Sequence, residues 1–341
     1  MNKQIPVIII FAPTACGKTA LVTKYFGQGS LWHFKKPDSF SLCKIPGEVI
    51  SADSQAVYRE FNIGTAKADS ATLKELPHHL IDIVEPGCQF GVADFVNRAD
   101  TLAKDIFSRK HIPLLVGGSG FYIRNFLLGL SKAPESNLEI RQKIKERIKT
   151  EGNKKLYFEL KSIDSDYAEK IDIHDQYRIC RALEVYYSSG KKLSSYAVSN
   201  ELRKNYDFCT IILNRPRQEL YKRIDSRLEE MFSLGLVDEI KGLLDKGYNA
   251  SMPAFKAIGY SEFFDPDSHD FKLSRSKALS GQDIQKIEEI KNQIKHHSHR
   301  YAKRQYTFMK DIPGALVIDA DDEENFCKTI SSFLQKHRED F

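Results

Sequence analysis

The 341-residue sequence has no long apolar run, few cysteines and little net charge. No segment approaches the roughly 20 consecutive apolar residues that a membrane-spanning helix needs. The six cysteines, at positions 16, 43, 88, 180, 209 and 327, contain no CxxC pair. We therefore predict neither a disulfide framework nor a zinc module, and we expect a reducing cytoplasm. A net charge of +5 does not by itself indicate a nucleic-acid partner.

Internal repeats, low-complexity tracts and coiled-coil seams are also missing, so we expect a monomer. The length suggests about two domains, and 41% hydrophobic residues suffice for a core. The positive charge is unevenly distributed, because residues 291–310 hold six Lys or Arg and no Asp or Glu. Such a run is usually a solvated helix face. The aromatic residues between these cations are more typical of a surface that follows a nucleic-acid backbone and stacks bases.

Short runs rich in β-branched residues predict strands, and stretches with helical periodicity, such as residues 92–107, lie between several of them. The predicted strands are residues 7–11, 49–51, 80–84, 113–116, 210–213 and 315–318. This alternation predicts an α/β fold with a parallel sheet covered on both faces.

The middle of the chain, residues 137–198, is helical, charged and nearly free of strands, which predicts a helical insertion. Its clearest helices are residues 141–149, 154–163 and 178–187. Another helix, residues 217–246, should return the chain to the core. Residues 268–285 are polar, and we expect a loop or a short helical pair there.

The strongest local motif follows the first predicted strand, where residues 7–19 read VIIIFAPTACGKT. A loop of this kind directs backbone N–H groups at phosphate oxygens, while Lys18 adds a full charge and the Thr19 hydroxyl can bind Mg²⁺. Ala12 replaces the first glycine of the motif. The alternatives are a chance GKT in a surface loop and, for the apolar run after Lys3, a signal peptide. Pro13 interrupts that run, so we favour a buried strand.

Asp53 follows the next strand, in residues 50–59 reading ISADSQAVYR. Parallel α/β sheets bind their ligands at the carboxyl ends of the strands. Asp53 could hold Mg²⁺ through water or accept a proton. The pattern equally allows an aspartate that only caps the next helix.

A third motif, residues 112–122, reads IPLLVGGSGFY, a buried strand that ends in glycines with Ser119 among them. The glycines would permit close approach of a ligand. No acidic residue is present where many ATPases and kinases carry a metal-binding carboxylate. A simple glycine turn is the alternative.

Together the motifs resemble the tRNA dimethylallyltransferase (tRNA isopentenyltransferase) family, bacterial type, over about residues 5–310. The matching segments are residues 12–19, 53–54 with 58, 63–67, 77–82, 93–95, 113–122, 178–186, 231 with 235–236, 257–260 and 301–305. The resemblance implies a P-loop NTPase-like α/β core with a parallel sheet flanked by helices, plus an all-helical insertion domain. We expect the core in residues 1–130, the tRNA-binding insertion in 131–204, and in 205–341 a return to the core with RNA-contacting helices.

The resemblance also implies a reaction. The enzyme would transfer a dimethylallyl group from dimethylallyl diphosphate to N6 of the adenosine 3′-adjacent to the anticodon, position 37, and release diphosphate. Its partners would be dimethylallyl diphosphate and the anticodon stem-loop of tRNAs that read codons beginning with U, with Mg²⁺ as cofactor and no membrane. Asp53 would accept the proton of the exocyclic amine, and the target nucleotide would be extruded from its stack.

The family's functional positions map onto this sequence in four groups. The catalytic residues would be Asp53, Ser119 and Arg141. The diphosphate-binding residues would be Ala12, Pro13, Thr14, Ala15, Cys16, Gly17, Lys18, Thr19 and Arg223, and the metal ligand Thr19. The tRNA-binding residues would be Asp53, Ser54, Gln55, Ala56, Tyr177, Arg178, Ile179, Cys180, Arg181, Lys256, Gly259, Tyr260, Lys303, Arg304 and Gln305.

Several positions depart from the family pattern. Ser119 replaces a threonine but keeps its hydroxyl, Ala56 replaces a frequent glutamine that here stands one place early as Gln55, and Ser298-His299 replaces Thr-Arg. Phe308 replaces a tryptophan. Three other functions compete with the family's: a P-loop kinase or NTPase that binds ATP, a prenyltransferase acting on AMP or ADP, and a non-catalytic RNA-binding protein.

Overall fold

A computed structural model describes residues 3–28, 34–35, 42–43, 45–197, 200–276 and 278–341. The chain forms two compact units. Met1–Leu127 and Arg203–Phe341 make up an α/β unit, and Leu128–Leu202 make up a helical unit. The helical unit overlaps the predicted insertion, residues 131–204. No helix among the described residues has the length and apolar character needed to cross a bilayer.

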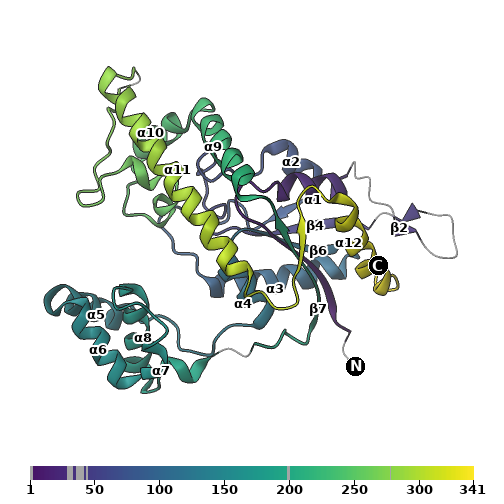
Figure 1. Ribbon diagram of the computed structural model, residues 1–341, viewed down its shortest axis with the longest axis horizontal. Coiled ribbons are helices and arrows are strands. Elements are labelled where there is room, and N and C mark those ends of the chain that lie inside the picture. Colours follow the sequence, from purple (N-terminus) through teal and green to yellow (C-terminus); the bar gives the residue numbers. More distant parts are fainter. Residues whose placement is uncertain (1–2, 29–33, 36–41, 44, 198–199, 277) are drawn as a thin grey trace. The chain divides into compact units, whose positions relative to one another are not determined.

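Six parallel strands form the sheet of the α/β unit (Figure 1), and their order is β5-β4-β6-β1-β7-β8. They are β1 (Ile5–Phe11), β4 (Gly47–Ala52), β5 (His78–His79), β6 (Ile112–Gly117), β7 (Tyr206–Asn214) and β8 (Leu316–Asp319). β2 (Phe34–Lys35) and β3 (Leu42–Cys43) form a separate antiparallel pair. Residues 7–11 of β1 are fully buried, because a central parallel strand is covered on both faces. The predicted α/β fold with a parallel sheet is confirmed.

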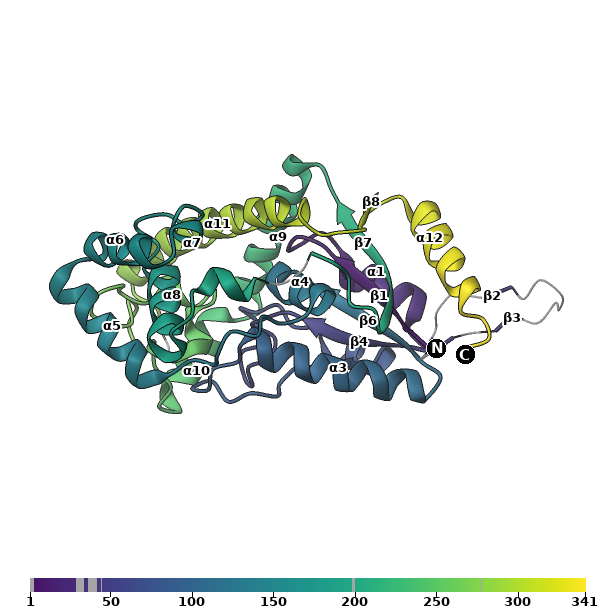
Figure 2. The same ribbon diagram turned by 90° about the horizontal axis from the view of Figure 1, so that it is seen from below.

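Helices cover both faces of this sheet. α3 packs on one face, where its buried residues recur at helical spacing, while α1 and α12 pack against the other (Figure 2). The remaining helices of the unit lie between or after the strands in the chain. In chain order the helices are α1 (Lys18–Phe26), α2 (Ser70–Glu75), α3 (Val92–Ser108), α4 (Gly120–Leu128), α9 (Arg217–Ser233), α10 (Leu236–Asp245), η2 (Pro253–Lys256), η3 (Ser261–Phe263), α11 (Gly281–Met309) and α12 (Glu323–Lys336).

The predicted strand at residues 80–84 is wrong. The strand that joins the sheet here is β5, which pairs with β4 through His78 and His79. Leu80 and Asp82 have φ values of 64° and 54°. This left-handed conformation cannot continue an extended strand, although Leu80 and Val84 at the two ends of the run are buried.

Two helical predictions also need correction. The predicted helix 217–246 is interrupted at Gly235, whose φ of 96° divides it into α9 and α10. Residues 281–285, predicted as loop or short helix, instead begin the 29-residue helix α11. Ser280 and Asp283 cap its start reciprocally, with Asp283 N donating to Ser280 Oγ at 3.1 Å and Ser280 N donating to Asp283 Oδ2 at 2.9 Å.

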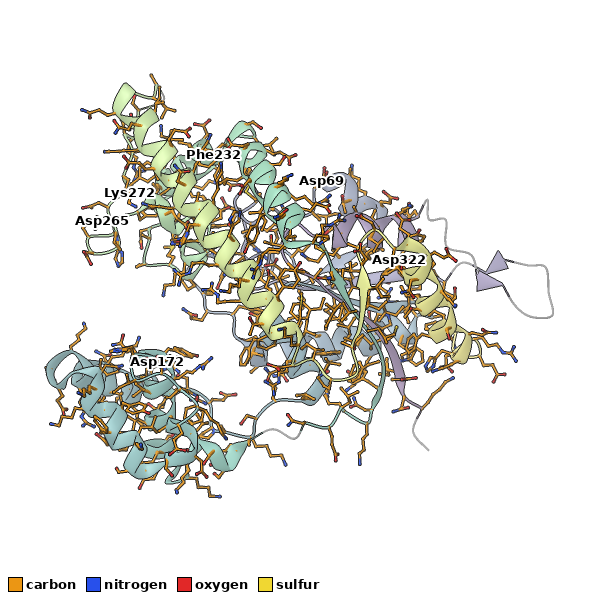
Figure 3. The ribbon with its side chains drawn as sticks, viewed as in Figure 1. Asp69, Asp172, Phe232, Asp265, Lys272 and Asp322 are labelled. Atoms are coloured by element: carbon orange, nitrogen blue, oxygen red, sulfur yellow. The ribbon has the colours of Figure 1, made fainter. Side chains whose placement is uncertain are left out.

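The last thirty residues, which carry none of the family motifs, complete the α/β unit. β8 adds an edge strand, and α12 buries Phe326, Ile330 and Leu334 against the core. Asp322 caps α12 and Asp69 caps α2, each by accepting a backbone N–H of the first turn (Figure 3).

The helical unit has its own apolar core. Its elements are α5 (Leu138–Glu151), α6 (Asn153–Ile163), α7 (Ser165–Ala168), α8 (Gln176–Ser189) and η1 (Leu193–Tyr196). Ile144, Leu156 and Leu183 are at most 2% exposed and pack together. Because this core is built entirely from residues of the unit, the unit is compact in its own right.

A buried carboxylate joins three elements at the amino ends of the strands. Glu48, at 4% exposure, accepts hydrogen bonds from His79 Nε2 at 2.7 Å, His111 Nδ1 at 2.5 Å and Arg109 Nη2 at 3.0 Å. Burial alone would raise the pKa of Glu48, but the hydrogen bonds from Arg109 and the two histidines lower it to about 2.

We predict that Glu48→Gln reduces the stability of the fold at pH 7 and that this difference narrows in acid. Because the folded pKa lies below the ordinary value of 4.5, the ionised carboxylate stabilises the fold above that pH, and the effect is lost as pH falls toward 2. Its contribution is about 3 kcal/mol, at about 1.4 kcal/mol for each pH unit of pKa difference. Urea unfolding between pH 7 and pH 3 measures it. Glu324→Gln, an exposed residue of α12, should match the unsubstituted protein, and parallel acid profiles for Glu48→Gln would contradict the prediction.

Candidate active site

A cavity of about 780 Å³ opens in the α/β unit near the carboxyl ends of β1, β4 and β6. Its walls come from the loop between β1 and α1, the residues after β4, a loop at residues 64–68, helix α9, residues 256–259 and helix α11. This end of a parallel sheet is where α/β proteins bind their ligands. We therefore take this cavity as the candidate active site.

The predicted phosphate loop forms one wall of the cavity. Thr14, Ala15, Gly17, Lys18 and Thr19 line it, whereas the side chains of Ala12 and Cys16 are buried beneath. Gly17 has a φ of 99° and precedes α1, whose first-turn N–H groups have no partner within the helix. Such groups bind anions, with the positive end of the helix dipole behind them.

The substitution of glycine by Ala12 is compatible with this loop. Ala12 is fully buried and is not among the residues with positive φ, so no conformation restricted to glycine is required there. The left-handed residues of the loop are instead Ala15, with φ of 60°, and Gly17.

Of the cationic side chains that line the cavity, Lys18 lies in the phosphate loop and Arg223 and Arg227 come from α9. Burial lowers the pKa of Lys18 and of Arg227, while the charge of Asp53 acts in the opposite direction on both. Arg223 Nε donates to the carbonyl of Ala15 at 2.9 Å, which ties α9 to the loop. Partly desolvated cations near backbone N–H groups suit a ligand with several negative charges.

Sequence reasoning missed Arg227. Its Nη2 donates to the carbonyl of Ala66 at 3.1 Å, and the residue is half-buried in the cavity wall. The available signal was its spacing of four residues from Arg223, which puts both arginines on one face of α9.

Asp53 lies at the end of β4 and lines the cavity. Its Oδ1 accepts hydrogen bonds from Gln55 N at 2.8 Å and Ala56 N at 3.3 Å, so the side chain also stabilises the following turn. Its Oδ2 accepts no hydrogen bond from any residue in the part of the chain that the structure describes. One oxygen is thus held by the backbone, and the other can accept a proton from a ligand.

Ser119 is adjacent to Asp53 but does not line the cavity. Its Oγ accepts a hydrogen bond from Ser54 N at 3.0 Å, and its own N–H donates to the carbonyl of Ala52 at 3.1 Å. The Ser119 side chain therefore joins the end of β6 to the turn that carries Asp53.

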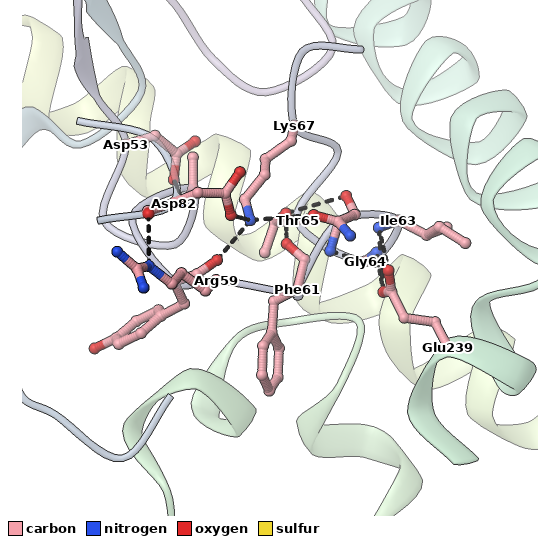
Figure 4. A network of polar contacts seen from close by, with 12 residues as sticks. Asp53, Arg59, Phe61, Ile63, Gly64, Thr65, Lys67, Asp82 and Glu239 are labelled. Atoms are coloured by element: carbon pink, nitrogen blue, oxygen red, sulfur yellow. Dashed lines mark hydrogen bonds and ion pairs between the residues drawn. The ribbon is translucent and has the colours of Figure 1, made fainter. Parts of the chain in front are cut away.

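The loop at residues 62–67 is held from two sides (Figure 4). The carboxylate of Glu239 accepts the backbone N–H groups of Asn62, Ile63 and Gly64 at 2.8–3.3 Å. Lys67 donates to the carbonyl of Tyr58 and to Asp82, both at 2.5 Å. These contacts fix the wall that presents residues 64–68 to the cavity.

Residues 256–260 form a further wall, with different roles for their side chains. Lys256 is exposed, whereas Tyr260 is fully buried and its hydroxyl donates to Glu239 at 2.6 Å. A Cβ on Gly64 would lie 2.5 Å from the ring of Tyr260, so this loop position requires glycine. The Tyr260 side chain thus packs behind the cavity, and Lys256 and Gly259 line it.

Helix α11 contributes Ser298, Tyr301, Arg304 and Gln305 to the cavity. Burial, followed by the charge of Asp53, raises the pKa of Tyr301 to about 12. Lys303 and Arg304 are exposed, while Gln305 is 4% exposed. The predicted basic segment therefore has one face in solvent and another in the cavity wall.

Two of the three histidines in this segment, His297 and His299, have polar partners within the α/β unit. His299 stacks on Tyr221 with ring centroids 4.1 Å apart, and its Nε2 lies 2.8 Å from Asp225 Oδ1. His297 Nδ1 lies 2.6 Å from the buried carboxylate of Glu262. Both rings therefore anchor α11 within the α/β unit.

The remaining predicted residues belong to the helical unit. Arg141 donates through Nε and Nη2 to Glu184 Oε2 at 3.1 and 2.9 Å, and Glu184 is fully buried. Burial would raise the pKa of Glu184, but hydrogen bonds from Ser136 and Arg141 lower it. Arg181 lies 3.3 Å from the same carboxylate. Within its unit, Arg141 therefore stabilises the packing of α5 against α8.

Predicted RNA contacts on α8 fall on two faces of that helix. Ile179 and Cys180 are buried in the core of the helical unit. Tyr177 is 69% exposed, and Arg178 is exposed next to it. An RNA contact from this helix is thus possible for the side chains of Tyr177 and Arg178, whereas Ile179 and Cys180 stabilise the unit.

Comparison with known proteins identifies similar chains over nearly the whole length. The pattern of the family described as IPP transferase matches residues 56–312. A tRNA dimethylallyltransferase from Thermoanaerobacter sp. strain X514 is 37% identical over 329 residues, which cover 94% of each chain. A tRNA dimethylallyltransferase from Borrelia hermsii is 36% identical over 321 residues, covering 94% of this chain and 96% of the relative.

Solved structures agree with these sequence matches. A tRNA delta(2)-isopentenylpyrophosphate transferase from Staphylococcus epidermidis is 29% identical, with a TM-score of 0.61, and the match covers 98% of this chain and 100% of that one. A eukaryotic dimethylallyltransferase acting on tRNA is 25% identical, with a TM-score of 0.74, and the match covers 97% of this chain and 77% of that one.

Proposed function

The chain belongs to the IPP transferase family, and from this membership we propose that it is a tRNA dimethylallyltransferase. It transfers the dimethylallyl group of dimethylallyl diphosphate to N6 of adenosine 37, next to the anticodon, in tRNAs that read codons beginning with U. Diphosphate is released. We further propose that it acts as a monomer in the cytoplasm.

One observation carries the chemical part of this proposal. Asp53 lines the same cavity as the phosphate loop and the cations Lys18, Arg223 and Arg227. An acceptor for a proton and a binding site for a polyanion are thus present together. Transfer of a group from a diphosphate to an amine needs both.

Asp53 is the proposed general base. The lone pair of the adenine N6 amine is delocalised into the ring, so the amine becomes a better nucleophile as its proton leaves. During attack the N6–C1 bond forms, the C1–O bond breaks with its electron pair on the diphosphate, and the proton moves to Asp53 Oδ2. The hydrogen bonds of Oδ1 to Gln55 N and Ala56 N hold the carboxylate in place.

The cations stabilise the leaving diphosphate. Negative charge grows on its oxygens as C1–O breaks, and Lys18, Arg223 and Arg227 together with the N–H groups of α1 are available to bind it. Arg223 and Arg227 are held before reaction by hydrogen bonds to the carbonyls of Ala15 and Ala66, so their stabilisation of the diphosphate requires little reorganisation.

We propose Mg²⁺ as cofactor, held by the hydroxyl of Thr19, which lines the cavity next to Lys18. Among the described residues, no group of three His, Cys, Asp or Glu side chains could hold a metal ion. A single protein hydroxyl, that of Thr19, suits Mg²⁺, because this ion takes most of its ligands from water and substrate phosphates. When bound, the ion would neutralise charge on the diphosphate.

The direct test offers labelled dimethylallyl diphosphate to the enzyme with tRNA, with AMP, or with neither. We expect label in tRNA alone, at the adenosine beside the anticodon. Transfer to AMP would instead indicate an enzyme of free nucleotides. ATP hydrolysis without RNA would support a kinase or NTPase, and no transfer at all would contradict the proposed activity.

A further prediction concerns tRNA binding by α11. Replacing Lys303 and Arg304 by alanine should weaken tRNA binding at low salt and flatten its salt dependence. Each lost phosphate contact lowers the log–log slope by roughly 0.7–0.9. Stacking by Tyr306 or Phe308, worth about 1–3 kcal/mol per base, would hardly depend on salt. Binding curves at several salt concentrations separate the two contributions.

The matched control removes the same charge elsewhere. Lys336 and Arg338 are exposed at the end of the chain, and their double alanine variant should bind tRNA like the unsubstituted enzyme. If the Lys303/Arg304 variant keeps both affinity and slope, α11 is not part of the RNA site and the helical unit holds the tRNA.

A further inference from the structure

Gln305 lies on α11 beside the predicted RNA-binding residues Lys303 and Arg304, yet its side chain is 4% exposed. Its Oε1 accepts a hydrogen bond from the backbone N–H of Thr14 at 3.1 Å. Its Nε2 donates to the carbonyl of Gly118 at 2.8 Å. One side chain thus bridges the phosphate loop and the end of β6, and both of its polar atoms have partners within the protein.

These two contacts affect the groups that a diphosphate would meet. Gly118 lines the cavity, and a carbonyl oxygen without a donor near an anion site would repel the anion. The Gly118 carbonyl oxygen accepts a hydrogen bond from Gln305 Nε2, and Tyr301 Oη lies 3.4 Å from the same oxygen. By accepting the Thr14 N–H, Gln305 also restrains the loop whose next residues Ala15, Gly17 and Lys18 line the cavity.

We propose that Gln305 is a positioning residue for diphosphate rather than a contact to RNA. It fixes the spacing between the phosphate loop and the turn at Gly118, so that the anion site exists before substrate binds. The identity of the ligand rests on the proposed function. The role itself follows from the two hydrogen bonds and the burial of the side chain.

Two variants break this bridge from opposite ends. Gln305→Leu keeps most of the volume and loses both hydrogen bonds. Gly118→Ala introduces a Cβ that would lie 2.5 Å from Gln305 Nε2, which forces the carboxamide to move. Gly118 is not among the residues with positive φ, so alanine can adopt its backbone conformation. Gln285→Leu, on the exposed face of the same helix, is the matched control.

The measurement is calorimetric titration of each folded variant with inorganic diphosphate and Mg²⁺, and separately with tRNA. Two hydrogen bonds at about 0.5–1.5 kcal/mol each, with tenfold in affinity per 1.4 kcal/mol, predict diphosphate binding that is weaker by roughly 5–100-fold in both variants. The variant that combines Gln305→Leu and Gly118→Ala should bind diphosphate as tightly as the single variant with the lower affinity, because both changes break the same bridge. Affinity for tRNA and the Gln285→Leu control should stay within about twofold of the unsubstituted enzyme.

A merely structural role would lower the binding stoichiometry or the unfolding temperature and leave the diphosphate Kd unchanged, and that result would overturn the proposal. Weaker tRNA binding with unchanged diphosphate binding would overturn it as well and assign Gln305 to the RNA site. The titration needs no group transfer. An unsubstituted enzyme that binds diphosphate but does not modify tRNA would therefore contradict the proposed function alone.

Discussion

Replacing Asp53 by asparagine is expected to lower turnover by about 10²–10⁴-fold, the usual contribution of a general base. The amide cannot accept the proton of the adenine amine. Its carbonyl oxygen can still accept the N–H groups of Gln55 and Ala56, so the turn after β4 should keep its conformation. Affinity for tRNA should remain within a few-fold. Single-turnover kinetics with bound tRNA measure the chemical step directly.

The control for this substitution is Asp69→Asn. Asp69 caps α2 by accepting the N–H of Thr72 at 2.7 Å, a bond that asparagine can also accept. This variant changes the net charge by the same amount and should retain full turnover. A turnover of Asp53→Asn within tenfold of the unsubstituted enzyme would remove Asp53 from the role of base and leave it as the residue that stabilises the turn.

Replacing Lys18 by alanine is the second change for which we expect a large effect. Its ammonium lines the cavity next to the first turn of α1, and burial lowers its pKa, so the side chain is partly desolvated without a ligand. Hydrogen bonds to charged groups contribute about 1.5–3 kcal/mol. At tenfold per 1.4 kcal/mol, kcat/KM for dimethylallyl diphosphate should fall by roughly 10–100-fold.

Lys222→Ala provides the charge-matched comparison, because Lys222 is exposed on α9 and does not line the cavity. It should leave kcat/KM unchanged, and neither variant should alter tRNA affinity by more than a few-fold. Protection of the unsubstituted enzyme against thermal unfolding should come from dimethylallyl diphosphate. Protection by ATP instead would favour the kinase interpretation.

Prediction of the secondary structure succeeded where neighbouring residues narrowed the alternatives. The run at residues 7–11 is apolar at every position, and Pro13 with the phosphate-binding sequence after it favoured a buried strand over a signal peptide; all five residues are fully buried in β1. It failed at residues 80–84, where Leu80 and Val84 are buried but Leu80 and Asp82 adopt left-handed backbone conformations. Local hydrophobicity reports burial, and backbone conformation follows only when the contacts around the segment are known.

Some residues of the candidate site could be predicted from sequence motifs, and others could not. Lys18 and Thr19 follow a recognisable loop and lie in the cavity as expected. Arg227 belongs to no motif, and its only signal was its spacing of four residues from Arg223 on the same helix. Its role depends on the loop at Ala66, which is 161 residues away in sequence.

By itself, the sequence determined the α/β class, the phosphate loop and the position of Asp53 after a strand, because each depends on residues close together in the chain. The tertiary structure alone decided which side chains share the cavity and which support it from behind. Gln305 accepts a hydrogen bond from the backbone N–H of Thr14 across 291 residues, and no local pattern in the sequence identifies Thr14 as its partner. Helical periodicity indicates that one face of α11 is buried. Which residues that face contacts depends on how the helix packs against the sheet and the phosphate loop.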